Sequence, residues 1–165
     1  MLKKLALAAA AVALGAVAAH AATAVGTFTV QATIAPVCTV DTSTANVDFL
    51  TIGGTASQIV PAASTPIIVN CSSGTGYTIT MASAHAGGST GFQMINGAKS
   101  MAYELFPNSY GNPQWDATVG GTYSGAGSGG NQTINLYARI PAQPAPGGVW
   151  TTGAYTDTVT MTLTY

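Results

Sequence analysis

The chain has 165 residues, of which 47% are hydrophobic, and only four basic and five acidic side chains give it a formal net charge of −1. Binding to nucleic acids or to anionic membranes depends on clustered lysine and arginine, and this chain has too few to cluster. The high hydrophobic fraction and low charge also exclude an intrinsically disordered chain.

The first 21 residues have the features of a secretory signal peptide. Lys3 and Lys4 precede a long apolar run, and Ala19-His20-Ala21 fits the small-x-small pattern of a cleavage site. We expect cleavage after Ala21, with Ala24 as the alternative. Later stretches are not apolar enough to span a bilayer, so we predict export without membrane insertion.

The segment that follows, GTFTVQATI at 26–34, alternates between apolar and polar residues. Phe28, Val30, Ala32 and Ile34 fall on one side, which predicts a half-buried β-strand. Pro36 then breaks the run and favours an extended conformation before it. This allows the strand to act as an arm that leaves the domain, although it could equally fold back into its own sheet.

The rest of the chain predicts short strands separated by Gly, Pro, Asn and Ser. Asn96-Gly97 is a two-residue hairpin signal, and the glycine-rich stretch 120–131 predicts a flexible loop or hairpin tip. We expect strands at 37–41, 45–53, 64–71, 77–82, 92–95, 99–107, 132–141 and 154–165. Their inward residues should be Val47, Phe49, Leu50, Ile67, Val69, Tyr77, Ile79, Met81, Met101, Tyr103, Leu105, Ile134, Leu136, Ala138, Ile140, Tyr155, Val159, Met161, Leu163 and Tyr165. This pattern predicts an all-β sandwich.

Cys38 and Cys71 are the two cysteines of the chain. In an exported protein an even number of cysteines favours a disulfide. The loop that it closes spans about 34 residues, for which chain entropy suggests roughly 3–4 kcal/mol of stabilisation. A zinc site is the weaker interpretation, because His85 is the sole histidine after the signal and has no partner at ligand spacing.

Candidate catalytic groups are sparse. His85 lies in a small-residue loop and is interpreted as solvated, and Asp48 and Asp157 are interpreted as turn or network acids. The aromatic residues Tyr110, Trp115, Tyr123 and Trp150 could stack on sugars, but we expect them to fill the ends of the sandwich. We therefore predict that the protein is not an enzyme and needs neither cofactor nor metal.

Several segments together resemble a known family. They are the first strands ending in Cys-Thr-Val and in Cys71, the MAYELF segment followed by Trp115, the LYARIP strand, and the terminal GAYTDTVTMTLTY. Their order is similar to that of the spore coat protein U domain, a family that includes pilin subunits of archaic, Csu-type chaperone–usher pili. The resemblance covers nearly the whole chain after the signal.

The resemblance implies an immunoglobulin-like β-sandwich that is incomplete and carries an N-terminal donor-strand arm. It implies that a periplasmic chaperone first fills the subunit's groove and that, at the outer-membrane usher, the arm of a homologous pilin subunit replaces the chaperone. The arm residues would be Phe28, Val30, Ala32 and Ile34. The groove or chaperone contact would involve Val159, Met161, Leu163 and Tyr165, which are equally compatible with ordinary core positions.

We thus expect a signal peptide at 1–21, a donor-strand arm at 22–36 and a pilin domain at 37–165. The chain stops at the end of its most strongly alternating strand, which suggests an unpaired edge that another strand could join. The predicted function is a structural subunit of a cell-surface pilus that supports adhesion or biofilm formation. The alternative is a self-contained secreted coat or carbohydrate-binding protein.

Overall fold

A computed structural model describes residues 21–165 apart from 56–58, 88–90, 111–112 and 116–120. The predicted signal peptide therefore lies outside the described residues, except for Ala21. The chain divides into two units, with the boundary between Thr33 and Ile34. In the first unit, residues 21–33 contain neither helix nor strand, and Val25, Phe28 and Val30 are more than 80% exposed.

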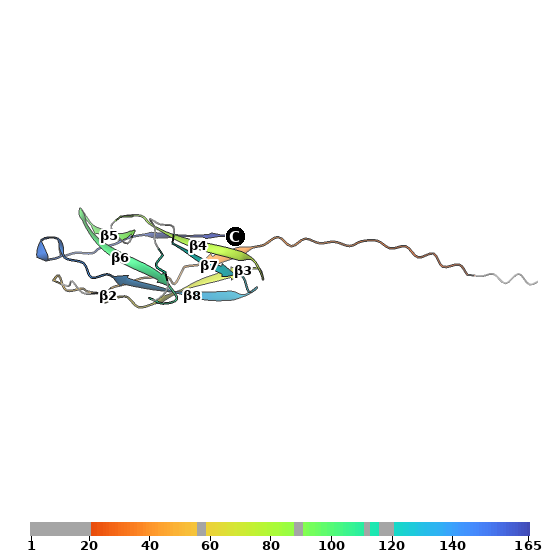
Figure 1. Cartoon of the computed structure of the whole chain (residues 1–165), viewed down its shortest axis with the longest axis horizontal. Helices are drawn as coiled ribbons and strands as arrows, with labels where there is room; N and C mark the ends of the chain where they lie inside the picture. The colour runs from red at the N-terminus through yellow and green to blue at the C-terminus, as the bar shows by residue number, and fades with distance from the viewer. Residues whose placement is uncertain (1–20, 56–58, 88–90, 111–112, 116–120) are drawn as a thin grey trace, which may run out of the picture. The chain divides into compact units, whose positions relative to one another are not determined.

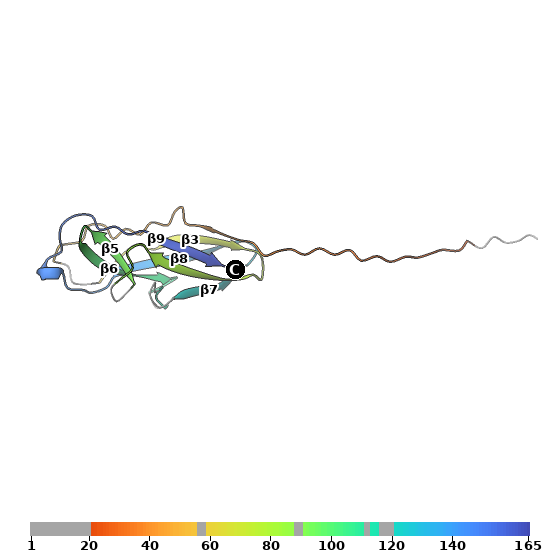
Figure 2. The same ribbon diagram turned by 90° about the horizontal axis from the view of Figure 1, so that it is seen from above.

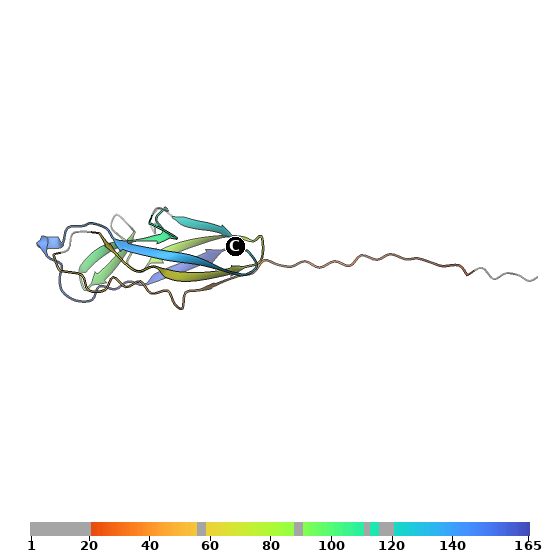
Figure 3. The ribbon, with the colours of Figure 1, turned by 90° about the horizontal axis from the view of Figure 1, so that it is seen from below.

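The second unit is a sandwich of two antiparallel β-sheets (Figure 1). The larger sheet has the order β1-β3-β8-β6-β5, with β2 also paired to β8, and the smaller has the order β7-β4-β9. Figure 2 shows the sandwich with β4 and β9 toward the viewer, and Figure 3 shows it with β3 and β8 toward the viewer. The strands are β1 (Cys38–Asp41), β2 (Val60–Pro61), β3 (Thr65–Cys71), β4 (Gly76–Ser83), β5 (Phe92–Asn96), β6 (Lys99–Pro107), β7 (Thr122–Ala126), β8 (Asn131–Ile140) and β9 (Val159–Thr164).

Alternating apolar residues of the two sheets form the core, as expected for a sandwich. Along β3, β4 and β8 every second side chain is buried, and the residues between them face outward. The prediction of inward residues is confirmed by burial at Ile67, Val69, Tyr77, Ile79, Met81, Met101, Tyr103, Leu105, Ile134, Leu136, Ala138 and Ile140. The prediction of an all-β sandwich is also confirmed.

The predicted hairpin at Asn96-Gly97 forms between β5 and β6, but one residue later. Asn96 pairs with Lys99, so the two loop residues are Gly97 and Ala98. Gly97 has a φ of 59°, which explains why a glycine begins this turn.

The strand predicted at 45–53 is wrong, because residues 45–53 form no ladder with another strand, and side chains bind their backbone instead. After β1, the Ser43 amide donates to Asp41 Oδ1 at 2.8 Å, and the buried hydroxyl of Thr65 bonds to the backbone of Thr44 and Asn46. Leu50 then adopts a φ of 58°. The segment still alternates, with Val47 and Phe49 packed against the core, whereas Leu50 is 82% exposed rather than inward.

The loop predicted at 120–131 contains a strand, β7, which pairs with β4. Gly125 lies opposite Tyr77, and a Cβ built on Gly125 would come within 2.4 Å of the Tyr77 ring. Packing therefore requires a glycine at position 125, because the absence of a side chain lets the buried Tyr77 of β4 lie across the neighbouring strand.

Candidate functional site: a groove between two strand edges

The two sheets end on one side of the sandwich in strands that have a single neighbour. Among the described residues, β1 pairs with β3 alone and β9 pairs with β4 alone. Each strand therefore presents a row of backbone N–H and C=O groups on its other edge. Such edges are templates for pairing with a further strand.

A cavity of about 480 Å³ lies between these edges. Val40 of β1 and the following segment, with Val47 and Phe49, line one side, and Val159 and Met161 of β9 line the other. The floor consists of residues from both sheets: Ile67, Met81, Met94, Tyr103, Leu105 and Leu136. Polar residues complete the lining: Thr42, Asn46, Tyr155, Thr156 and Asp157. We call this cavity the groove.

The groove explains why inward residues of the edge strands are only partly covered. Val40 lies opposite Val69 on the inward face, and yet it is 40% exposed while Val69 is fully buried. Met161 and Leu163 of β9 are likewise half-buried, whereas their partners Met81 and Ile79 on β4 are buried. Apolar side chains that face inward but stay accessible are suited to binding another apolar strand.

The structure places the four predicted β9 residues in different surroundings. Val159 and Met161 line the groove, and Leu163 packs against the core beyond the groove lining. Tyr165 lies past the end of β9 and is 56% exposed. The prediction did not include the opposite wall. The sequence signal for this wall is the alternation of Val47 and Phe49, which equally predicts a strand paired within the sheet.

The predicted arm residues carry exposed side chains. Phe28 and Val30 are 88% and 81% exposed, Ala32 is also exposed, and Ile34, the first residue of the second unit, is 89% exposed. The strand predicted at 26–34 is not formed in the single chain. The insertion of these arm residues into a groove therefore stays a prediction.

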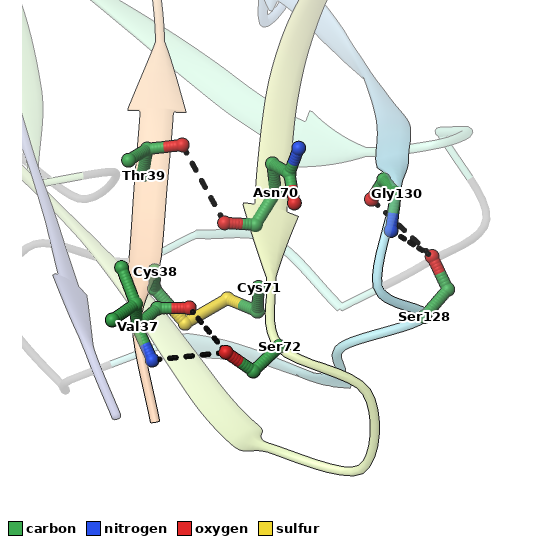
Figure 4. The surroundings of a disulfide bond; sticks show 8 residues. All are labelled: Val37, Cys38, Thr39, Asn70, Cys71, Ser72, Ser128 and Gly130. Carbon is green, nitrogen blue, oxygen red and sulfur yellow. Dashed lines mark hydrogen bonds between the residues drawn. A yellow bond between two sulfur atoms is a disulfide. The ribbon is translucent and has the colours of Figure 1, made fainter. Parts of the chain in front are cut away.

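The predicted disulfide is present at the start of the domain. Cys38 of β1 and Cys71 of β3 lie directly opposite each other and are bonded, with an S–S distance of 1.99 Å (Figure 4). Just before it, the Val37 amide donates to Ser72 Oγ at 3.1 Å, and the Ser72 amide donates to the Val37 carbonyl at 2.9 Å. Val37, the first residue after the predicted arm, is thus fastened to Ser72, the residue that follows β3.

A buried carboxylate lies at one end of the groove. The side chain of Asp157 is only 3% exposed, and it accepts hydrogen bonds from the hydroxyls of Ser83 and Tyr103 at 2.6 Å each. Its other oxygen lies 2.9 Å from Nδ1 of His85. His85 lies in the turn after β4 with its side chain 37% exposed, as expected of a solvated loop histidine, but the turn also brings it to Asp157. The prediction of a network acid at Asp157 is confirmed.

Opposing effects set the pKa of Asp157. Burial by itself would raise this pKa, but the hydrogen bonds from Ser83, Tyr103 and His85 outweigh it and hold the pKa below its ordinary value. The pKa of the Tyr103 hydroxyl is raised, first by burial and then by its bond to the carboxylate. The network therefore holds an ionised Asp157 between neutral hydroxyl donors.

This network differs from a nucleophilic triad. The Ser83 hydroxyl donates to Asp157 itself, whereas a triad requires the serine to be bonded to the histidine that activates it. It joins β4, β6 and the segment before β9, so its geometry is that of a structural crosslink. Asp48 is an exposed turn acid, since its Oδ1 accepts the Leu50 amide at 2.7 Å.

The aromatic residues predicted to fill the ends of the sandwich lie in different places: Tyr123 is within β7, and Tyr110 packs against Phe106 and the outward-facing Tyr137 of the larger sheet. Trp115 and Trp150 are 1% and 8% exposed, and they contact the rings of Tyr123 and Tyr155. The Tyr110 hydroxyl donates to the Ala138 carbonyl at 3.0 Å. Their faces are therefore engaged within the domain rather than presented for stacking on a sugar.

The part of the chain that the structure describes contains no group of three or more His, Cys, Asp or Glu side chains placed to hold a metal ion. Within the same residues, no helix has the length and apolar character needed to cross a membrane.

Comparisons with known proteins agree with this geometry. A solved structure from Acinetobacter baumannii, the CsuC–CsuE chaperone–tip adhesion subunit pre-assembly complex from archaic chaperone–usher Csu pili, contains a chain of similar fold, with a TM-score of 0.55 and 20% identity. The match covers 81% of this chain and 40% of that one, so this chain spans about two-fifths of its length. The search of curated proteins found no match. The family model described as the Spore Coat Protein U domain matches residues 24–162, and the chain belongs to this family.

Proposed function

We propose that the protein is a pilin-type subunit that is exported to the cell surface and polymerises by strand insertion. In this proposal, the arm of one copy, residues 22–36, enters the groove of the next. The observation that carries it is the groove itself, a cavity with an apolar floor, flanked by two strand edges that have free hydrogen-bonding groups. The arm offers the complementary feature, an exposed segment with apolar residues at every second position.

Inserted as a strand, the arm would meet both requirements of the groove. Its backbone would form hydrogen bonds with the free edges of β1 and β9. Pairing of a peptide with the edge of a sheet is a recurrent mode of recognition. Phe28, Val30, Ala32 and Ile34 would point into the cavity together, because side chains of a strand alternate with period two. Burying a large apolar side chain contributes about 1.5–3 kcal/mol, so three large ones favour a stable insertion.

Insertion between different copies yields a fibre. The arm and the groove are different surfaces, so the contact is heterologous, and a joined pair still has one unused arm and one unused groove. A periplasmic chaperone that covers the groove before assembly fits this proposal, and it is supported by the chaperone complex among the similar folds. An outer-membrane usher and a role in adhesion or biofilm formation complete the proposal.

Deleting the arm tests this function. The full exported chain should migrate as a ladder of oligomers in detergent without boiling, and the chain lacking Ala22–Ile34 should migrate as a monomer. Val30→Asp should also abolish the ladder, because insertion would bury an unpaired negative charge in a groove that already holds the carboxylate of Asp157. Gln31→Asp is the matched control: it adds the same charge on the other side of the arm, so the ladder should persist.

The proposal fails if the full chain stays monomeric at every concentration, or if the ladder is indifferent to the loss of the arm. A ladder disrupted equally by Val30→Asp and Gln31→Asp would also contradict it, because strand insertion distinguishes the two sides of the arm.

A further inference from the structure

The methionines of the described chain form two cross-strand pairs at the groove. Met81 of β4 lies opposite Met161 of β9, and Met101 of β6 lies opposite Met94 of β5. In each pair one member is buried and the other is half-buried: Met81 and Met101 are 6% exposed, whereas Met94 and Met161 are more accessible and line the groove.

We propose that Met161 and Met94 are oxidation sites at which a peroxide blocks strand insertion. This inference rests on the proposed function, since it takes the arm of a second copy as the occupant of the groove. An accessible thioether is the target of such oxidants, and the groove leaves these two methionines accessible until a strand covers them.

The chemistry needs only the peroxide. A lone pair of the methionine sulfur attacks one peroxide oxygen, a sulfur–oxygen bond forms, and the oxygen–oxygen bond breaks. The second oxygen leaves as water after proton transfer. The thioether is oxidised by two electrons to the sulfoxide, and the peroxide is reduced.

The effect on binding follows from the polarity of the sulfoxide. In the open groove its oxygen remains hydrated, so the folded subunit tolerates it. An inserted strand would displace that water, and its inward side chains Phe28, Val30, Ala32 and Ile34 offer no hydrogen-bond donor in place of the water. Burying an unpartnered polar group is unfavourable, and we expect arm binding to weaken about tenfold or more.

Peptide mapping and a binding assay test the two halves of this inference. The full exported chain carrying Val30→Asp, whose own arm is disabled, is treated with hydrogen peroxide, and each methionine is quantified by mass spectrometry. Binding of a labelled peptide of residues 22–36 is measured before and after treatment. We expect oxidation at Met161 and Met94 ahead of Met81 and Met101, protection by bound peptide, and weaker binding afterwards.

Leucine variants supply the controls, because leucine has a similar volume and resists peroxide. Whatever affinity Met161→Leu with Met94→Leu shows for the peptide before treatment should be the same after treatment, because no accessible thioether remains in the groove. Met101→Leu should leave the sensitivity unchanged, since its sulfur is buried.

The outcomes separate this inference from the proposed function. If Met81 and Met101 oxidise as fast as their partners, or if the oxidised chain binds the peptide as tightly as before, the inference is wrong and the proposed function stands. If the untreated chain fails to bind the peptide, the proposed function fails, and the inference fails with it.

Discussion

At the scale of single residues, Asp157 is the charged side chain that links β4, β6 and the segment before β9 at one end of the groove. It is 3% exposed and yet ionised, because three side chains from β4, β6 and the turn after β4 donate to it or pair with it. Hydrogen bonds to a charged group are stronger than neutral ones, and each donor would be left unsatisfied without it. The carboxylate thus fixes where the chain enters β9.

Replacing this carboxylate should lower stability in a manner that depends on pH. At pH 7, Asp157→Asn should reduce the free energy of unfolding by about 2–3 kcal/mol, measured by urea denaturation. The pKa of Asp157 is depressed in the folded state, so the carboxylate stabilises the fold above its unfolded pKa, and this contribution is lost as the pH falls through the folded pKa. The difference between wild type and variant should be full above about pH 5 and shrink below about pH 4.

Asp48→Asn is the matched control for this prediction. Asp48 is exposed and accepts only the Leu50 amide, a bond that asparagine can also make, so its effect should stay within about 0.5 kcal/mol. The pKa of Asp41 is also lowered, but Asp41 is present in every variant, and differences between them isolate Asp157. If the difference in unfolding free energy between wild type and Asp157→Asn stays constant down to pH 3, the ionised carboxylate of Asp157 is not the source of that stability.

At the scale of elements, alternation predicted a strand well wherever both neighbours of that strand lie within the chain. β3, β4 and β8 follow their sequence pattern because every second side chain meets the opposite sheet. The pattern failed at 45–53 because alternation reports only which side chains face inward. It carries no information on whether the backbone has a partner, and here Thr65 and Asp48 bind that backbone instead.

The missed strand β7 has a different cause, namely that glycine is ambiguous in sequence. At Gly125 the absence of a side chain makes room for Tyr77, and only the pairing of β4 with β7 reveals this. Gly125→Ala should therefore destabilise the domain by about 1–3 kcal/mol through overpacking against a buried ring, measured by urea denaturation.

Gly76→Ala provides the comparison for Gly125→Ala. Gly76 is also in this sheet and pairs with Ala126, but a Cβ there would meet nothing within 4 Å, and we expect it to be tolerated. Equal losses in the two variants would mean that backbone flexibility, rather than the Tyr77 contact, is the property that matters.

At the scale of the whole molecule, the sequence predicted an arm and half of the site. The apolar face of β9 and the cysteine pair were evident from spacing alone. The second wall was not, because it is built by Val40, whose strand is only four residues long, and by an unpaired segment that no periodicity distinguishes from a strand. The groove arises from the order of strands in two sheets, which places β1 and β9 at adjacent edges, and strand order is a long-range property.

The second wall gives the last prediction, because it should be as necessary for assembly as the arm. Val40→Asp places a charge on the face of β1 that lines the groove, at a position already 40% exposed, so the domain should still fold while the detergent-stable ladder disappears. Thr39→Asp adds the same charge to the opposite face of the same strand and should leave the ladder intact. Circular dichroism and urea denaturation of both variants would show that each is folded. A ladder that persists in both would mean that β1 is not a wall of the site, and its loss in both would mean that the effect does not depend on the face of β1 that lines the groove.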